Sequence, residues 1–501
     1  MGWHIGRRDA RALLGTVLFG LKLLGTSLTA GCPAEFLVRV DETDAGAAEK
    51  DAGFTLPDVP DSCLSEPQSP TSISGTTVGD GGSASCTASA LQAALDRGGW
   101  IRFNCGGSST VVPIESPLSV RQSGTRLDGG GRITLSGQGS SRVLQVHEGA
   151  APVTLVGLSI TSGSGDRGAG IQIHQNATVW LDQVALTSNV ATGETAAGAQ
   201  PRNGGGAIHI APGARLVGLN TNFLNNRASF GGALWNQGET ILFGGRLTSN
   251  LTLEEGLEQG GGISATGGSL RMCQVRVENN SAAEGGAIFV DGGALRAERT
   301  HFVNNTASGS VSQTGSGGAI RGMGSELSLS RCSFEGNISA DSGGALALSG
   351  GASSIQNTSF IANAASGGSG GALYIDEGDH RLVHNTMFGG SSRNGGSELA
   401  GSGLVTLYGN LLVGGDSVCG DTYQGDGVLQ SPGIPCVPSA IQDDGLQLKM
   451  LAVECDHLEG RVPSADSAAI DQAAASTCPE FDMCGAVRDR DACDLGAVER
   501  P

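Results

Sequence analysis

The residues best suited to chemistry gather in one short stretch, "IDEGDHRLVHN", at residues 375–385. Within nine residues it holds acids, an arginine and two imidazoles, namely Asp376, Glu377, Asp379, His380, Arg381 and His384. Carboxylates can hold Ca²⁺ on an acidic sugar while an arginine acts as base, and close aspartates can cleave a glycosidic bond. We interpret the stretch as a loop between repeats, where these side chains are expected to form a solvated surface rather than a site.

Other catalytic patterns are absent from the sequence. Carboxylates do not recur at one register in adjacent repeats, and the cysteines show neither a C-x-x-C pair nor a zinc spacing. Asp128 in "DGGG" is expected to cap a turn rather than to act in catalysis. We therefore predict no metal and no cofactor, with Ca²⁺ required only if the protein is a polysaccharide lyase.

Composition narrows the class of protein further. Glycine makes up 83 of 501 residues and aromatic residues only 4%, which favours many short strands joined by tight turns over a packed helical protein. The formal net charge is −19, which argues against nucleic acid and anionic membrane surfaces as partners. Trp and Tyr do not form a recurring row of the kind that stacks on sugars.

A repeated element, a large apolar residue followed three positions later by Asn, sets the organisation. The apolar residues are Leu186, Phe223, Leu247, Val277, Phe302, Phe334 and Phe360. The asparagines are Asn189, Asn226, Asn250, Asn280, Asn305, Asn337 and Asn363. A Gly-Gly-Ala element precedes most copies by about 14 residues, and the residue after it is apolar in every unit: Ile208, Leu234, Ile263, Ile288, Ile320, Leu346 and Leu373.

Each unit contains three short runs in which apolar residues alternate with polar ones. One run follows Gly-Gly-Ala, one lies seven and five residues before the large apolar residue, and one ends at that residue. Such a unit cannot bury its apolar face alone but can do so when stacked on copies of itself. The sequence therefore predicts an all-β, right-handed, single-stranded parallel β-helix with three sheets, and places Cys332 in its core.

The asparagines are predicted to form a structural ladder at one corner of the coils. Each amide would bond its neighbour and the turn backbone, and Asn tolerates the left-handed conformation that a corner needs. All length variation falls between the Asn and the next Gly-Gly-Ala, as in residues 191–204, 251–260 and 308–317. These insertions would line one side of the molecule, either as a binding face or as tolerated drift in solvent.

The two ends of the chain carry different signals. Residues 1–31 read as a lipoprotein-type signal peptide that ends in "LTAGC", with Cys32 as the lipid attachment site; ordinary secretion is the alternative. Residues 32–80 read as a disordered acidic tether. The β-helix is assigned to residues 81–415, with a capping helix at 86–99, and residues 416–501 to a cysteine-rich C-terminal cap whose disulfide pairing stays open.

Three segments resemble known bacterial envelope proteins. The "GGAI" and "FxxN" repeats at about 165–390 are similar to those of chlamydial polymorphic outer-membrane proteins. Residues 86–136 resemble the first coils of pectin-lyase-like β-helix proteins, and "SAAIDQAAASTCPEFDMCGAVRDRDACDLGAVER" resembles the end of choice-of-anchor Q domain proteins. The resemblance implies a β-helix in the cell envelope, expected to be an outer membrane lipoprotein facing the surface, and implies little about activity.

These observations favour a monomeric, non-enzymatic, lipid-anchored surface protein that acts in adhesion or binds an extracellular glycan or protein. The alternative is a polysaccharide lyase or glycoside hydrolase acting on an acidic polysaccharide. A third reading is a structural envelope component without a discrete ligand. The membrane would be contacted through the lipid anchor alone.

Overall fold

The computed structural model describes residues 75–192, 203–253 and 258–499, with short gaps at 312, 416, 432, 444, 446–449, 456–457, 466, 475 and 490–492. All of these residues belong to one compact unit, Pro60–Pro501. The predicted signal peptide, the lipid attachment site Cys32 and the tether up to residue 74 lie outside the described residues.

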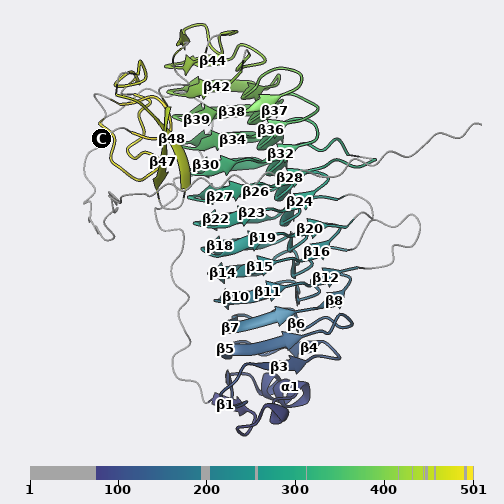
Figure 1. Ribbon diagram of the computed structural model, residues 1–501. Helices are drawn as coiled ribbons and strands as arrows, with labels where there is room; N and C mark the ends of the chain where they lie inside the picture. Colours follow the sequence, from purple (N-terminus) through teal and green to yellow (C-terminus); the bar gives the residue numbers. More distant parts are fainter. Residues whose placement is uncertain are drawn as a thin grey trace, which may run out of the picture. The chain divides into compact units, whose positions relative to one another are not determined.

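The predicted parallel β-solenoid is confirmed, with three parallel sheets whose strands follow the sequence order from coil to coil (Figure 1). The largest sheet bends and so has two columns. Its first column contains β1 (Gly75–Val78), β2 (Trp100–Phe103), β5 (Thr125–Ser136), β7 (Val153–Thr161), β10 (Thr178–Asp182), β14 (Arg215–Leu219), β18 (Glu239–Phe243), β22 (Ser269–Cys273), β26 (Ala294–Glu298), β30 (Glu326–Ser330), β34 (Ala352–Gln356), β38 (Asp379–Val383), β42 (Leu404–Tyr408) and β44 (Gln424–Asp426).

Its second column contains β3 (Thr110–Pro113), the second halves of β5 and β7, β11 (Ala185–Thr187), β15 (Asn222–Leu224), β19 (Arg246–Thr248), β23 (Arg276–Glu278), β27 (His301–Val303), β31 (Ser333–Glu335), β35 (Ser359–Ile361), β39 (Thr386–Phe388), β43 (Leu411–Val413), β45 (Leu429–Gln430) and β46 (Ile441–Gln442). Two of the three predicted runs therefore belong to one hydrogen-bonded sheet rather than to two.

The second sheet contains β4 (Leu118–Val120), β6 (Leu144–Val146), β9 (Ile171–Ile173), β13 (Ile208–Ile210), β17 (Leu234–Asn236), β21 (Ile263–Thr266), β25 (Ile288–Asp291), β29 (Ile320–Met323), β33 (Leu346–Ser349), β37 (Leu373–Asp376) and β41 (Leu399–Ala400). These strands follow the Gly-Gly-Ala elements, in the predicted register.

The third sheet was not foreseen as a sheet, because its strands have two residues each and show no alternation. They are β8 (Ser164–Gly165), β12 (Val190–Ala191), β16 (Arg227–Ala228), β20 (Leu251–Thr252), β24 (Ser281–Ala282), β28 (Thr306–Ala307), β32 (Ile338–Ser339), β36 (Ala364–Ala365) and β40 (Ser391–Ser392). From β12 to β36 they begin directly after the repeated asparagines, whereas β8 and β40 follow Gly163 and Gly390.

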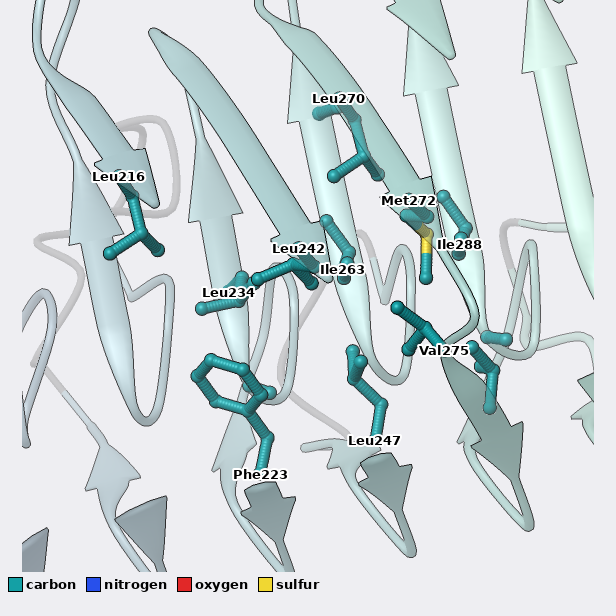
Figure 2. Close-up of a cluster of buried hydrophobic side chains, with 14 of the residues drawn as sticks. Leu216, Phe223, Leu234, Leu242, Leu247, Ile263, Leu270, Met272, Val275 and Ile288 are labelled. Atoms are coloured by element: carbon teal, nitrogen blue, oxygen red, sulfur yellow. The ribbon is translucent and has the colours of Figure 1, made fainter. Parts of the chain in front are cut away.

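Apolar side chains from all coils stack in columns inside the solenoid. Figure 2 shows Leu216, Phe223, Leu242 and Leu270 among the side chains that fill the space enclosed by the strands. The predicted alignments hold, since Phe223 pairs with Leu247 in the next coil. This column is the source of the hydrophobic stabilisation, because a lone coil would leave it exposed to water.

The repeated asparagines form a hydrogen-bonded ladder from Asn189 to Asn363. In each step the side-chain amide donates to the next side-chain oxygen at about 3 Å, as from Asn226 Nδ2 to Asn250 Oδ1 at 3.0 Å. The same amide donates to the preceding coil, from Asn226 Nδ2 to the Leu186 carbonyl at 2.9 Å. The left-handed corner falls one residue before the Asn, as at Asn225 with φ 55°, so the ladder residues themselves do not occupy it.

Both glycines of the Gly-Gly element are required by the backbone. In one coil the first, Gly231, has φ +56°. A Cβ on the second, Gly232, would lie 2.2 Å from the Gly261 carbonyl oxygen of the next coil. A side chain at that second position would therefore push neighbouring coils apart.

The N-terminal end is covered by α1 (Ala88–Arg97), which lies inside the range predicted for a capping helix. The Thr87 hydroxyl accepts a hydrogen bond from the Ala90 amide, and Leu91 and Leu95 are buried, as expected from their spacing. A short 3₁₀ turn, η1 (Ser83–Ser85), precedes it. Strand β1 lies in residues that sequence analysis assigned to the tether, because its "TTV" run is β-branched and pairs with β2.

The C-terminal residues first continue the coils and then turn back. Strands β44 to β46 extend the stacking to Gln442. The antiparallel hairpin of β47 (Met450–Cys455) and β48 (Leu458–Pro463) then packs on the outer side of β31, β35 and β39. Buried Arg488 fixes the last segment, since it donates to the Gly496 carbonyl at 2.6 Å and to Glu499 Oε2 at 2.7 Å.

Disulfides join Cys86 to Cys105, Cys419 to Cys436, and Cys478 to Cys493. Cys273 and Cys484 are also disulfide-bonded. Within the described residues Cys332 alone is free, and it is fully buried in the solenoid interior, as predicted. Burial raises the pKa of its thiol to about 12.

Candidate functional site

The stretch at 375–385 is not a loop, because β38 continues the first column through it. Its register was obscured in the sequence by polar residues at inward positions. His380 pairs with Ser353 and Val405 of the neighbouring coils and is 1% exposed. Its Nδ1 lies 2.9 Å from Ser353 Oγ and its Nε2 lies 2.8 Å from the Glu377 carbonyl. Burial lowers its pKa, so it packs as a neutral core residue.

His384 occupies the bend between the two columns and holds the C-terminal segment. Its Nδ1 lies 3.1 Å from the Asp494 carbonyl, and the ring is fully buried. Burial, with the nearby Arg488 charge, lowers its pKa to about 3. The imidazole is therefore uncharged at neutral pH and faces protein rather than solvent.

The remaining predicted residues lie on the surface in different directions. Asp379 and Glu377 are exposed, and the Arg381 guanidinium lies over the Tyr408 ring at 5.3 Å. Asp376 accepts a hydrogen bond from Ser402 Oγ at 2.9 Å. The structure thus divides the stretch between core, C-terminal interface and surface. In the described part of the chain, no three His, Cys, Asp or Glu side chains are placed to hold a metal ion.

A groove of about 920 Å³ lies elsewhere, over the bend between the two columns of the large sheet. Its floor consists of outward side chains from β18, β19, β23, β27 and β31, and Leu458 of the C-terminal hairpin lies at its edge. We call it the bend groove. It is lined by Asn220, Phe243, Gly244, Gly245, Arg246, Gln274, Val275, Arg276, Glu278, Arg299, His301, Glu335 and Leu458.

A row of ionisable side chains crosses the floor of the bend groove. Arg276 Nε donates to Glu278 Oε2 at 2.5 Å, and another guanidinium nitrogen contacts His301 Nδ1 at 3.2 Å. Because a guanidinium can only donate, His301 carries its proton on Nε2, which lies 3.6 Å from Glu335 Oε2. Burial opposes ionisation of Glu278, but the Arg276 hydrogen bond and charge outweigh it and lower the pKa.

The other side of the groove offers unpaired polar groups beside an aromatic ring. The side chains of Asn220, Gln274 and Arg246 are exposed, and none makes a hydrogen bond or ion pair with the described residues. Half-buried Phe243 lies among them. Amides and a guanidinium around one aromatic surface can bind hydroxyl-rich molecules, which present polar edges and apolar faces.

Sequence reasoning missed these residues because they flank the inward repeat positions rather than occupy them. Arg246, Arg276 and His301 stand one residue before the repeated apolar residue, and Glu278 and Glu335 one residue after it. The two glutamates are separated by Val303 in the intervening coil, so a search in adjacent repeats passes over them. Reading the outward positions as columns would have found the cluster.

No family model and no curated protein matches this chain. Among solved structures, the periplasmic alginate epimerase AlgG matches with a TM-score of 0.33 and 11% identity, over 66% of this chain and 76% of that one. PfbA, a surface adhesin of Streptococcus pneumoniae, matches with a TM-score of 0.30 and 12% identity, over 75% and 95%. These weak likenesses carry no inference about function. None of the described helices is long and apolar enough to cross a membrane.

Proposed function

We propose that this protein is a non-enzymatic surface β-solenoid that binds an extracellular glycan in the bend groove. The observation that carries the proposal is the placement of Phe243 beside the unpaired side chains of Asn220, Gln274 and Arg246. A sugar ring can stack on the phenyl face while its hydroxyls replace the water bound by the amides. The coils fix the backbone positions of all four residues before a ligand arrives, which limits the ordering cost of binding to the side chains.

Binding of purified, full-length mature protein to a glycan array, followed by calorimetry on the hits, tests this proposal. Phe243→Ala and Gln274→Ala should each weaken binding about tenfold or more. Tyr408→Ala, which truncates a half-buried ring in the column of Phe243 several coils away, and Gln172→Ala, which truncates an outward side chain of β9, serve as matched controls. Binding to no glycan, or an equal loss of affinity in the variants and the controls, would contradict the proposal. Binding of a protein alone would show that the ligand is a protein rather than a glycan.

The alternative function, a polysaccharide lyase or glycoside hydrolase, draws on one specific observation. Arg276, His301, Glu278 and Glu335 bring bases, acids and a cation into the same groove. Incubation with acidic polysaccharides, followed by assays for unsaturated products and reducing ends, separates the two functions. Product formation that disappears in His301→Ala would establish an enzyme with its active site in the bend groove. Product formation that instead depends on Asp376 or Arg381 would place the active site at residues 375–385.

Attachment to the cell envelope through a lipid on Cys32 is part of the same proposal, with secretion as its alternative. The motif "LTAGC" supports it. Cells that express Cys32→Ser should release the protein and fail to incorporate a palmitate analogue. If membrane association and labelling both persist in that variant, the attachment site is wrong. Surface digestion of intact cells by protease then tests whether the protein faces outward.

A further inference from the structure

Six arginines gather on the outer face of four successive coils around the bend groove. We call them the arginine cluster: Arg246, Arg271, Arg276, Arg296, Arg299 and Arg331. Arg246 lies directly opposite Arg276 in the next strand, and Arg271 directly opposite Arg296. Arg299 and Arg331 occupy the same bend position of consecutive coils, both with positive φ, but Arg331 lies against the Phe481 ring at 5.6 Å and is mostly buried, so it adds positive charge rather than a contact surface. Neighbouring strands are about 4.8 Å apart, so each pair is close.

Such pairing opposes stability in the absence of a ligand. Like charges directly opposite one another on adjacent strands are unfavourable. At Arg296, burial and then the Arg271 charge lower the pKa of the guanidinium, and the Glu298 charge offsets part of this. At another strand position of the same column, Arg215 instead has an acidic partner on the adjacent strand, Glu239, at 3.4 Å.

The carboxylates around the cluster compensate it only in part. Glu298 is shared, lying 3.7 Å from both Arg299 and Arg331, and Glu278 is held by Arg276. The exposed side chains of Arg246 and Arg271 have neither a hydrogen bond nor an ion pair among the described residues. In a chain whose formal net charge is −19, this face is therefore a local exception to the sign of the charge.

We infer that the ligand of the bend groove is an acidic glycan whose carboxylate or sulfate groups bind the arginine cluster. This inference rests on the proposed function and names its ligand class. A guanidinium binds a carboxylate or sulfate through two parallel hydrogen bonds, which makes arginine better suited to such groups than lysine. A linear acidic glycan repeats its charges along the chain, so several sugars can meet arginines on successive coils at once.

Charge also separates this ligand from other polyanions. An extended nucleic acid would reach past the arginine cluster to the rest of the protein surface. That surface is negatively charged, as the nucleic acid is, and therefore opposes its approach. A short acidic oligosaccharide contacts the cluster alone. The stacking surface of Phe243 and the amides of Asn220 and Gln274 favour sugar rings with free hydroxyls over a simple inorganic anion.

The test compares polygalacturonate oligomers with their methyl esters, which keep the sugar rings and hydroxyls but replace each charged carboxylate by a neutral ester, on the mature full-length protein. The acid should bind at least about tenfold more tightly than the ester, and the preference should shrink as salt rises. Arg246→Gln with Arg271→Gln should reduce the preference about tenfold, whereas Arg215→Gln, a paired arginine outside the groove, should leave it intact. A sulfated oligosaccharide of equal length shows whether sulfate replaces carboxylate.

The outcomes separate this inference from the function on which it rests. Equal binding of acid and ester would overturn the acidic ligand while leaving glycan binding in place. An unchanged preference in the double arginine variant would overturn the assigned site. Equal binding of a single-stranded DNA oligomer would reduce the face to a non-specific anion surface and overturn the inference. Absence of binding to any glycan would remove the proposed function itself.

Discussion

Glu398 accepts a hydrogen bond from the Gly390 amide at 2.6 Å, at the place where the asparagine ladder ends. Gly390 stands where the next ladder residue after Asn363 would be, and Glu398 stands in the column of Ala372. The carboxyl group thus fills the space that the missing amide leaves. It is fully buried, and its second oxygen, Oε2, has no hydrogen-bond partner. Burial raises the pKa of Glu398 well above its usual range.

This relationship predicts a stability that falls with rising pH. The folded state binds the Glu398 proton more tightly than the unfolded state, so the stability from this group is full below pH about 4.5 and is lost as pH rises through the folded pKa. Glu398→Gln should therefore be more stable than wild type at alkaline pH, by about 1.4 kcal/mol for each unit by which the pKa is raised. Urea unfolding from pH 4 to about 9 measures the difference.

Glu326→Gln provides the control, because Glu326 is an exposed carboxylate at the start of β30 in the large sheet. It should track the wild-type curve throughout. Parallel curves for wild type and Glu398→Gln would show that the buried carboxyl does not titrate on unfolding.

The middle of the asparagine ladder should be intolerant of truncation. Asn280 donates to the Leu247 carbonyl at 2.9 Å and to Asn305 Oδ1 at 3.0 Å, and accepts from the Asn250 amide groups. Asn280→Ala leaves several buried groups without partners, so unfolding free energy should fall by about 3 kcal/mol or more. Asn222→Ala, a half-buried strand asparagine outside the ladder, should change it by less than about 1 kcal/mol. Equal effects would remove the ladder from the account of stability.

The thiol of Cys332 should be inert in the folded protein. It is fully buried and its pKa is raised to about 12, so at pH 8 almost none of it is thiolate. Alkylation with iodoacetamide, read by mass spectrometry on the peptide that carries Cys332, should label it only after denaturation. Rapid labelling under native conditions would mean that the coils around β31 open readily.

Loss of Arg488 should release the C-terminal segment without unfolding the coils. This arginine is buried and bonds the Asp494 and Gly496 carbonyls and Glu499, so its removal leaves Glu499 half-buried without its cation. Arg488→Met should cost about 3 kcal/mol or more locally. Protease should then cut within residues 458–499 first, whereas Arg381→Met should behave as wild type. Because Leu458 edges the bend groove, the release should also weaken glycan binding.

The repeat could be predicted from sequence because its signal is stacked many times. The alignment of Phe302 with Phe334 and of Ile288 with Ile320 follows directly from spacing. The two-residue strands such as β12 carry no periodicity, and the bend within the large sheet depends on single left-handed residues that sequence does not mark. A second short ladder, from Asn385 to Asn410, was not predicted, because the sequence pattern that marks the register of each repeat is unclear in this part of the chain.

The site was harder to predict than the fold for a related reason. Inward residues are constrained by packing and therefore repeat, whereas outward residues such as Arg246, Arg276 and His301 differ from coil to coil. The residues at 375–385 resemble a catalytic cluster when only their order in the sequence is considered. In the folded coil, however, His380 points inward and Arg381 points outward. Neighbours in space on this fold are about one coil apart in sequence, so local motifs are a poor guide to composite sites.

The constant register between coils has a consequence for the history of this molecule. From Asn189 to Asn363, each winding offers its successor the same asparagine and the same column of apolar side chains, and most windings share the paired glycines. A gene segment that encodes one full winding can therefore be copied or lost without a mismatch at the junction. The length of the solenoid can therefore change during evolution independently of the residues that bind the ligand.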